Sequence, residues 1–230
     1  MKKILSLFLV SVIATSGAVI LLQPGATQGA SDSKNFSVTQ SVGATIQVSV
    51  PTSAVDLGNL LAGNSTFSSD QTIKVVTNDS NGYSLSVGAG RVPALTLNGN
   101  DPANEGESFA DYSATTTSDW VAANASESLF GFTVGGSAIS AKLDSQFRGD
   151  GNNCGVGSFE YVDYITGGGL ESCWRGFTGT TSVPVGTATT YTSSTGDDYT
   201  VKFGSEIGAD KHQVSGNYNA TITFTATTNS

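Results

Sequence analysis

The chain has little of what helical proteins and histidine-dependent enzymes are built from. Only 13% of its 230 residues are charged, and it contains two cysteines and one histidine. Long soluble helices draw on Glu, Lys, Ala and Leu, so this composition does not favour a helical fold. Any Ser-His-Asp or Cys-His arrangement would have to use His212, which stands in a polar stretch of a chain without a nucleophile elbow. We expect His212 to be a surface residue.

Basic residues are also scarce. The chain has 10 Lys and Arg against 19 Asp and Glu, and its net charge is −9. The first 30 residues hold two lysines and no acid, so the other 200 residues carry 8 basic and 19 acidic side chains, a net charge of −11. An acidic domain repels nucleic acid and anionic lipid, so we expect no nucleic-acid partner. The acids are scattered along the chain, which favours a role in solubility over a cation-binding face.

The N-terminus has the pattern of an export signal. Two lysines precede an apolar run at 4–22, and the small residues Gly29 and Ala30 follow at a position suited to cleavage. We predict a signal peptide at 1–30 and a single domain at 31–230 that is secreted or held at the cell surface. The apolar run has 19 residues and is also long enough to cross a bilayer, so an uncleaved anchor is the alternative. We expect membrane association only in that case.

Alternation of apolar and polar residues predicts strands. The alternation is clearest at 38–50 and 218–227, and shorter runs lie at 130–134 and 199–203. The chain also has 28 glycines and many serines and threonines, which suits a β protein with many turns. We predict an all-β fold, an antiparallel β-sandwich of about seven to nine strands.

Three further predictions concern the pairing of strands and the segments between them. The runs at 73–77 and 83–87 flank a turn that contains Asn81-Gly82, so they predict a hairpin in which these residues supply positive φ angles. The Thr-rich stretch 182–198 is expected to include an edge strand. The polar stretch 99–128 predicts either a long loop or a short helix near its end.

The two cysteines are Cys154 and Cys173. In an oxidising compartment an even pair indicates a disulfide, and this one would close a loop of 19 residues and stabilise the fold by roughly 3 kcal/mol. The glycine-rich region 149–179 around them is predicted to be an insertion stapled between core strands.

Four segments resemble parts of known domains. They are 55–60 (VDLGNL), 71–75 (QTIKV), 77–87 (TNDSNGYSLSV) and 214–227 (VSGNYNATITFTAT). Their order resembles the exported β-sandwich domains of bacterial surface proteins, notably the WxL-like cell-wall-associated family, and the last segment is similar to secreted pilin-like domains such as the spore coat U family. The resemblance implies non-covalent attachment to peptidoglycan.

The chain departs from the WxL pattern at the motif that gives the family its name. Trp120 is followed by Val121-Ala122 and Trp174 by Arg175-Gly176, so a Trp-x-Leu motif is absent. No site residue of that family is therefore carried over to this chain.

A group of large side chains surrounds the cysteines and is a possible binding surface. Exposed aromatic rings can stack on sugars or dock a protein partner, whereas buried ones would form a satellite core packed on the cystine. Both readings remain open for the five residues Tyr161, Tyr164, Trp174, Arg175 and Phe177.

Carboxylate chemistry has weaker candidates. Glu160 with Asp163, and Asp197 with Asp198, are pairs that could hydrolyse a glycan, but residues three apart on a strand point to opposite faces. The loop 150–153 offers oxygen ligands from Asp150 and Asn152 to Ca²⁺, without the bidentate Glu of an EF-hand. We expect no enzyme activity and no cofactor.

The main hypothesis is a non-catalytic structural or interaction protein that contacts a cell-wall polymer or other surface proteins. One alternative is a glycan-binding module that uses the aromatic residues of 154–177. Another is a pilin-like subunit that associates with itself, in which the strand 38–50 adds to the sheet edge of a neighbour. A secreted hydrolase that uses paired carboxylates is the remaining alternative.

Overall fold

A computed structural model describes residues 37, 39–50, 54–99, 107–113, 120, 123–136, 139, 141–147, 173–177 and 182–230. The chain divides into two compact units, residues 1–41 and 42–230, and the second unit contains every strand described here. The predicted all-β class is confirmed, because the described residues form eleven strands and no α-helix. A short 3₁₀ helix lies at Ser145–Phe147.

The larger sheet has six strands in the order β1-β3-β9-β7-β6, with β2 also paired to β9. Its centre is β9, an eleven-residue strand that pairs with β3 and β2 along one edge and with β7 along the other. Buried residues alternate along much of β9, as expected for a strand with one face on the core. The strands of this sheet are β1 (Ile46–Ser49), β2 (Asn64–Phe67), β3 (Gln71–Thr77), β6 (Ala110–Asp111), β7 (Ser128–Gly135) and β9 (Asp197–Ile207).

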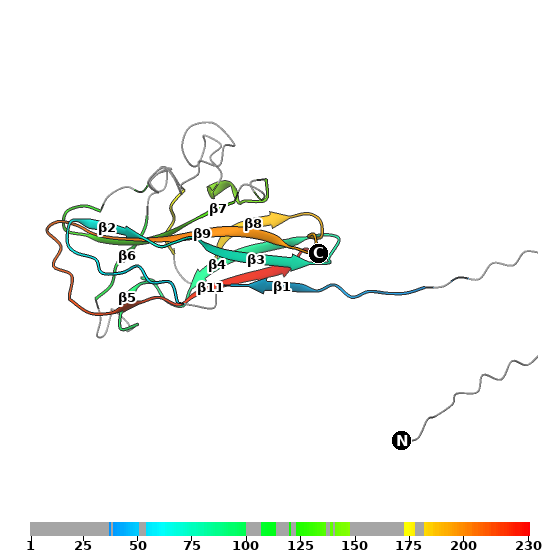
Figure 1. The fold of residues 1–230 in the computed structure, drawn as a ribbon, viewed down its shortest axis with the longest axis horizontal. Coiled ribbons are helices and arrows are strands. Elements are labelled where there is room, and N and C mark those ends of the chain that lie inside the picture. The colour runs from blue at the N-terminus through cyan, green and yellow to red at the C-terminus, as the bar shows by residue number, and fades with distance from the viewer. Residues whose placement is uncertain are drawn as a thin grey trace, which may run out of the picture. The chain divides into compact units, whose positions relative to one another are not determined.

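Two smaller sheets complete the described fold. One has the order β11-β4-β8, with β4 (Tyr83–Ala89) between β8 (Val183–Ala188) and β11 (Ile222–Thr228). The other pairs β5 (Thr96–Leu97) with β10 (Tyr218–Asn219). In Figure 1, β1 at one edge of the larger sheet lies beside β11 at one edge of the three-stranded sheet, and the two strands are in contact.

One hydrophobic core is shared by the six-stranded and three-stranded sheets. Val75 and Val201 from the larger sheet and Leu85 and Val87 from β4 are all buried in it. Burial of each such side chain stabilises the fold by about 1.5–3 kcal/mol. The alternation that predicted these strands therefore corresponds to one buried face in each sheet.

The predicted hairpin of 73–77 with 83–87 is wrong. Both runs are strands, but β3 pairs with β1 and β9, whereas β4 pairs with β11 and β8. A tight type I′ turn needs positive φ at both central residues; Gly82 has a φ of +80°, but Asn81 is not among the positive-φ residues. The chain therefore crosses from one sheet to the other at 78–82 and does not turn back along β3.

Other predictions are corrected in part. The strand expected at 38–50 is confined to β1, and residues 39–45 form no strand. The strand expected at 218–227 is interrupted at Ala220-Thr221, so that β10 and β11 join different sheets. The sheets are not wholly antiparallel, because β6 runs parallel to β7. The edge strand expected within 182–198 is confirmed as β8, which lies at the edge of its sheet.

Candidate functional site

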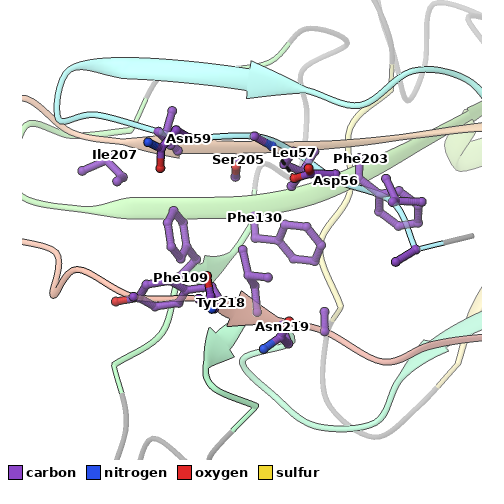
Figure 2. A pocket seen from close by; sticks show the side chains of 18 of the residues that line it. Asp56, Leu57, Asn59, Phe109, Phe130, Phe203, Ser205, Ile207, Tyr218 and Asn219 are labelled. Carbon is purple, nitrogen blue, oxygen red and sulfur yellow. Dashed lines mark hydrogen bonds between the residues drawn. The ribbon is translucent and has the colours of Figure 1, made fainter.

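A pocket of about 1150 Å³ lies beside the six-stranded sheet. Residues of β3, β7 and β9 line it, together with the irregular segment 54–62 and the segment 213–220 around β10. This volume exceeds the roughly 300–1000 Å³ of ordinary small-molecule sites. Figure 2 shows the pocket with Phe109, Phe130 and Tyr218 gathered inside it.

The inner wall of the pocket is the core face of the larger sheet. Phe130 of β7 and Phe203 of β9 are buried, and their rings stack with centroids 6.2 Å apart. Phe109 meets the Tyr218 ring edge to face at 5.0 Å. Because strand side chains alternate between faces, Phe203, Ser205 and Ile207 of β9 all reach the pocket. The wall is therefore mainly apolar.

The rim of the pocket carries exposed apolar side chains. Leu61 is 70% exposed, Val50 52% and Val214 48%. With Val55 they are four of the seven large hydrophobic residues that are exposed in the described part of the chain, and all four line the pocket. Scattered exposed hydrophobic residues are ordinary, whereas a group around a pocket indicates a surface that binds something.

Some polar groups of the pocket are bonded to one another. The Tyr218 hydroxyl donates to the carbonyl oxygen of Val214 at 2.7 Å and accepts from Gln213 Nε2 at 2.8 Å. Burial raises the pKa of Tyr218. Asp56 Oδ1 accepts a bond from the backbone N–H of Gly58 at 2.8 Å. Asp56 and Lys211 are the charged residues of the lining within the described part of the chain, and these described residues offer no pair of carboxylates for glycan hydrolysis.

The catalytic candidates from the sequence do not meet at this pocket. His212 is exposed and does not line it. Asp197 is buried and accepts a bond from Lys142, whereas Asp198 is exposed and pairs with Lys74 at 2.6 Å, so these neighbouring carboxylates point to different sides of β9. The other pair, Glu160 and Asp163, lies outside the described residues.

The candidate ligands for Ca²⁺, Asp150 and Asn152, also lie outside the described residues. Within the part of the chain that the structure describes, no three metal-ligating side chains come together.

The aromatic residues near the cysteines are divided between two cores. Trp174 and Phe177 are each only 1% exposed, so neither ring lies at a surface where it could stack on a sugar. Phe177 enters the main core and stacks on Phe132 at 4.7 Å. The segment 173–177 is held at the edge of β7 by paired backbone bonds between Phe132 and Arg175. Tyr161 and Tyr164 lie outside the described residues.

Trp174 belongs to a second, smaller cluster with Trp120 and Tyr112. The Trp120 and Trp174 rings meet edge to face at 4.9 Å, and Tyr112 stacks on Trp120 at 4.8 Å. Trp120 Nε1 donates to Glu206 Oε2 at 2.5 Å, and Phe67 packs against both indoles. These rings are structural. Cys173 is buried too, but Cys154 lies outside the described residues, so the disulfide stays a prediction.

Comparisons of the chain with protein-family models, with curated proteins and with solved structures gave no match. The resemblance to WxL-like domains therefore stays a prediction. No helix in the described ranges is sufficiently long and apolar to span a membrane.

The sequence did not predict the pocket. Its lining comes from segments far apart in the chain, and the one local signal is the set of apolar residues at 55–61, which lies outside any strand.

Proposed function

We propose that the chain is an exported, non-catalytic domain of the cell surface whose role is structural or lies in binding another macromolecule. The observation that carries this proposal is the pocket with an apolar inner wall and exposed hydrophobic residues at its rim. Binding of a partner at such a pocket is favoured because apolar surface is removed from water. The pocket supplies few groups that could move a proton. The export signal predicted at 1–30 gives the location.

The proposed architecture is a β-sandwich of the six-stranded and three-stranded sheets. Support comes from the core that both sheets share and from a polar contact through it. The hydroxyl of Tyr83 in β4 donates to Asp197 of β9 at 2.7 Å, which links the two sheets. β1 and β11 are in contact at the neighbouring edges.

The alternative of a glycan-binding module loses two of its supports, because Trp174 and Phe177 are buried. The alternative of a self-assembling subunit gains support, because the pocket is larger than an ordinary small-molecule site and has exposed apolar residues at its rim.

The test of location is export of the full chain with its own N-terminus from a bacterial host. We expect the protein outside the cytoplasm, with the mass of a product cleaved near Ala30. A Val10→Arg variant places a charge in the apolar run and should remain in the cytoplasm. Recovery of the unaltered chain from the cytoplasm would overturn the proposal.

The released protein is then mixed with isolated cell-wall sacculi. Saturable pelleting that is lost after digestion of the glycan would support a wall polymer as the partner. Protein that remains in the supernatant would exclude the wall and leave other surface proteins as partners.

A further inference from the structure

Asparagine side chains that the fold does not use gather at the pocket. Four asparagines line it and are exposed, and none of these four side chains forms a hydrogen bond with another residue that the structure describes. An asparagine elsewhere holds the chain in place, since Asn229 Nδ2 donates to the carbonyl oxygen of Ala188 at 2.8 Å. The pocket therefore presents carbonyl acceptors and N–H donors that are available to a ligand. The four asparagines are Asn59, Asn98, Asn217 and Asn219.

These amides come from two sides of the pocket. Asn59 belongs to the segment that connects β1 to β2, whereas the other three belong to the β5–β10 sheet or the residues next to it. The backbone N–H of Asn98 donates to the carbonyl oxygen of Asn217 at 2.7 Å, which brings those two residues together. Figure 2 shows Asn59 above Phe130 and Asn219 below it. A ligand in the pocket would therefore meet aromatic rings on the inner wall and amides on both sides.

The pocket carries little charge. Asp56 and Lys211 are the charged residues of its described lining, and their charges have opposite signs. Lys211 Nζ also lies 4.0 Å from Glu107 Oε2, so its charge is partly balanced. Residues 31–230 hold 8 basic and 19 acidic side chains, so the domain repels polymers that carry phosphate or carboxylate groups. The pocket is therefore suited to an uncharged ligand.

Sugar rings match this combination of groups. An amide side chain has one acceptor and two donor hydrogens, so it can bond two neighbouring hydroxyl groups at once. The C–H face of a sugar ring can stack on an aromatic ring. A lipid chain would instead cover the four amides without bonding them, and each buried polar group left unpaired costs free energy. The volume of about 1150 Å³ suits a polymer better than a single small molecule.

We propose that the pocket binds an uncharged polysaccharide, with the aromatic wall against the sugar rings and the four asparagines on their hydroxyl groups. This inference rests on the proposed binding function and names the class of ligand. It moves the sugar site from the aromatic residues of 154–177, among which Trp174 is buried, to the pocket. It also differs from the peptidoglycan attachment that the WxL resemblance implies, because peptidoglycan strands carry charged peptides.

Electrophoresis of the purified protein through native gels that contain a polysaccharide tests the class of ligand. The acidic chain migrates toward the anode, and binding to the polymer slows it. Hydroxyethylcellulose, laminarin and galactan are the uncharged probes, and carboxymethylcellulose is an acidic probe with the same backbone as the first. We expect at least one uncharged polymer to slow the chain and carboxymethylcellulose to leave its mobility unchanged. Absence of retardation by every uncharged polymer, or equal retardation by both cellulose derivatives, would overturn the proposal.

Asparagine variants test the place of binding. Asn59→Ala and Asn217→Ala should each raise the dissociation constant for the retarding polymer about threefold to tenfold, the effect of one or two lost hydrogen bonds. Both side chains are exposed and have no bond to lose in the fold, so the melting temperature should not change. Asn64→Ala removes an exposed amide outside the pocket and is the matched control. Equal affinities of all three variants would show that the pocket is not the site and would overturn the proposal.

Treated sacculi separate this inference from the proposed function. Sacculi that retain attached polysaccharides should pellet the chain, whereas sacculi stripped of them by hydrofluoric acid should not. Pelleting with stripped sacculi would assign the partner to peptidoglycan and would overturn this inference alone. Self-association that Leu61→Asp abolishes, without binding to any uncharged polymer, would assign the pocket to a second copy and would also overturn it. The gel measurements do not depend on export, so failure here is distinct from failure of the location test.

Discussion

The hydroxyl of Tyr83 lies 2.7 Å from Asp197 Oδ2 and 2.9 Å from the hydroxyl of Tyr199, inside the core between two sheets. Lys142 donates to the other carboxylate oxygen of Asp197 at 2.6 Å. Because Tyr83 donates to Asp197, it can accept the proton of Tyr199, so every member of the group has a partner. A buried polar network of this kind stabilises the fold only while all its members remain bonded.

The Tyr83→Phe variant should lower the free energy of unfolding by about 1–3 kcal/mol, because it leaves the buried Tyr199 hydroxyl without this partner and removes a donor from Asp197. Urea denaturation measures the change. Tyr191→Phe, at an exposed tyrosine, is the matched control and should alter the free energy by less than about 0.5 kcal/mol. Equal effects of both variants would contradict the role assigned to Tyr83.

The same group should make the protein sensitive to alkali. Burial raises the pKa of Tyr83 and raises that of Tyr199 to about 12. The folded state therefore keeps protons that the unfolded chain releases above about pH 10, and the free energy of unfolding should fall as the pH rises beyond that value. Denaturation at pH 8 and pH 11 should show a smaller fall for Tyr83→Phe. A fall of the same size in that variant would argue against Tyr83 as a source.

Trp174→Ala should destabilise the protein by about 3–5 kcal/mol, since it removes a buried indole that packs on Trp120 and Phe67. The change is measured by urea denaturation, with Tyr191→Ala as the exposed control. A Trp174→Ala protein with unaltered stability would contradict the structural role and would restore this side chain as a candidate for binding.

Strands were predictable where one face is buried over several residues, as in β3, β4 and β9. The pairing of the strands was not predictable from the sequence, because strands of both sheets show the same alternation and both sheets bury one face in the same core. The hairpin prediction failed for that reason. β5, β6 and β10 have two residues each, too few for a period to be seen.

The pocket was hidden from the sequence for a related reason. Val50, Leu61 and Val214 line one pocket only because the chain folds, and no local pattern distinguishes Val50 and Val214 from other exposed apolar residues. The aromatic residues near Cys173 were recognised as a group, but a sequence does not say on which side of a sheet edge each ring will lie. The structure places Trp174 and Phe177 in different clusters.

The disulfide prediction is tested by mass and stability. The protein isolated under oxidising conditions should be two mass units lighter than after reduction, and reduction should lower the free energy of unfolding by roughly 3 kcal/mol, as expected for a loop of 19 residues. Cys154→Ser is the matched variant, since it removes the predicted bridge outside the described core and leaves the buried Cys173 in place. Its stability should equal that of the reduced protein. An oxidised protein that contains two thiols would refute the bridge.

Asp111 gives the last prediction. Burial raises the pKa of its carboxyl group to about 6, although the backbone N–H groups of Ala94 and Phe177 favour the charged form. Ala94 N donates to Oδ1 at 3.1 Å, and Oδ2 is buried with no hydrogen bond within the distance limits to any residue that the structure describes. Ionisation of the buried carboxyl group therefore lowers the stability of the folded state, and protonation removes this loss.

The sign of the effect follows from proton binding. Between pH 4 and pH 6 the folded state holds a proton on Asp111 that the unfolded chain has lost, so this group's contribution to stability falls as the pH rises through that range. Asp111→Asn cannot ionise and should have a higher melting temperature than the unaltered protein at pH 7.5, with a smaller difference at pH 4.5. Asp210→Asn controls for the loss of an exposed carboxylate. A difference for Asp111→Asn that does not change with pH would show that the carboxyl group is not strained by burial.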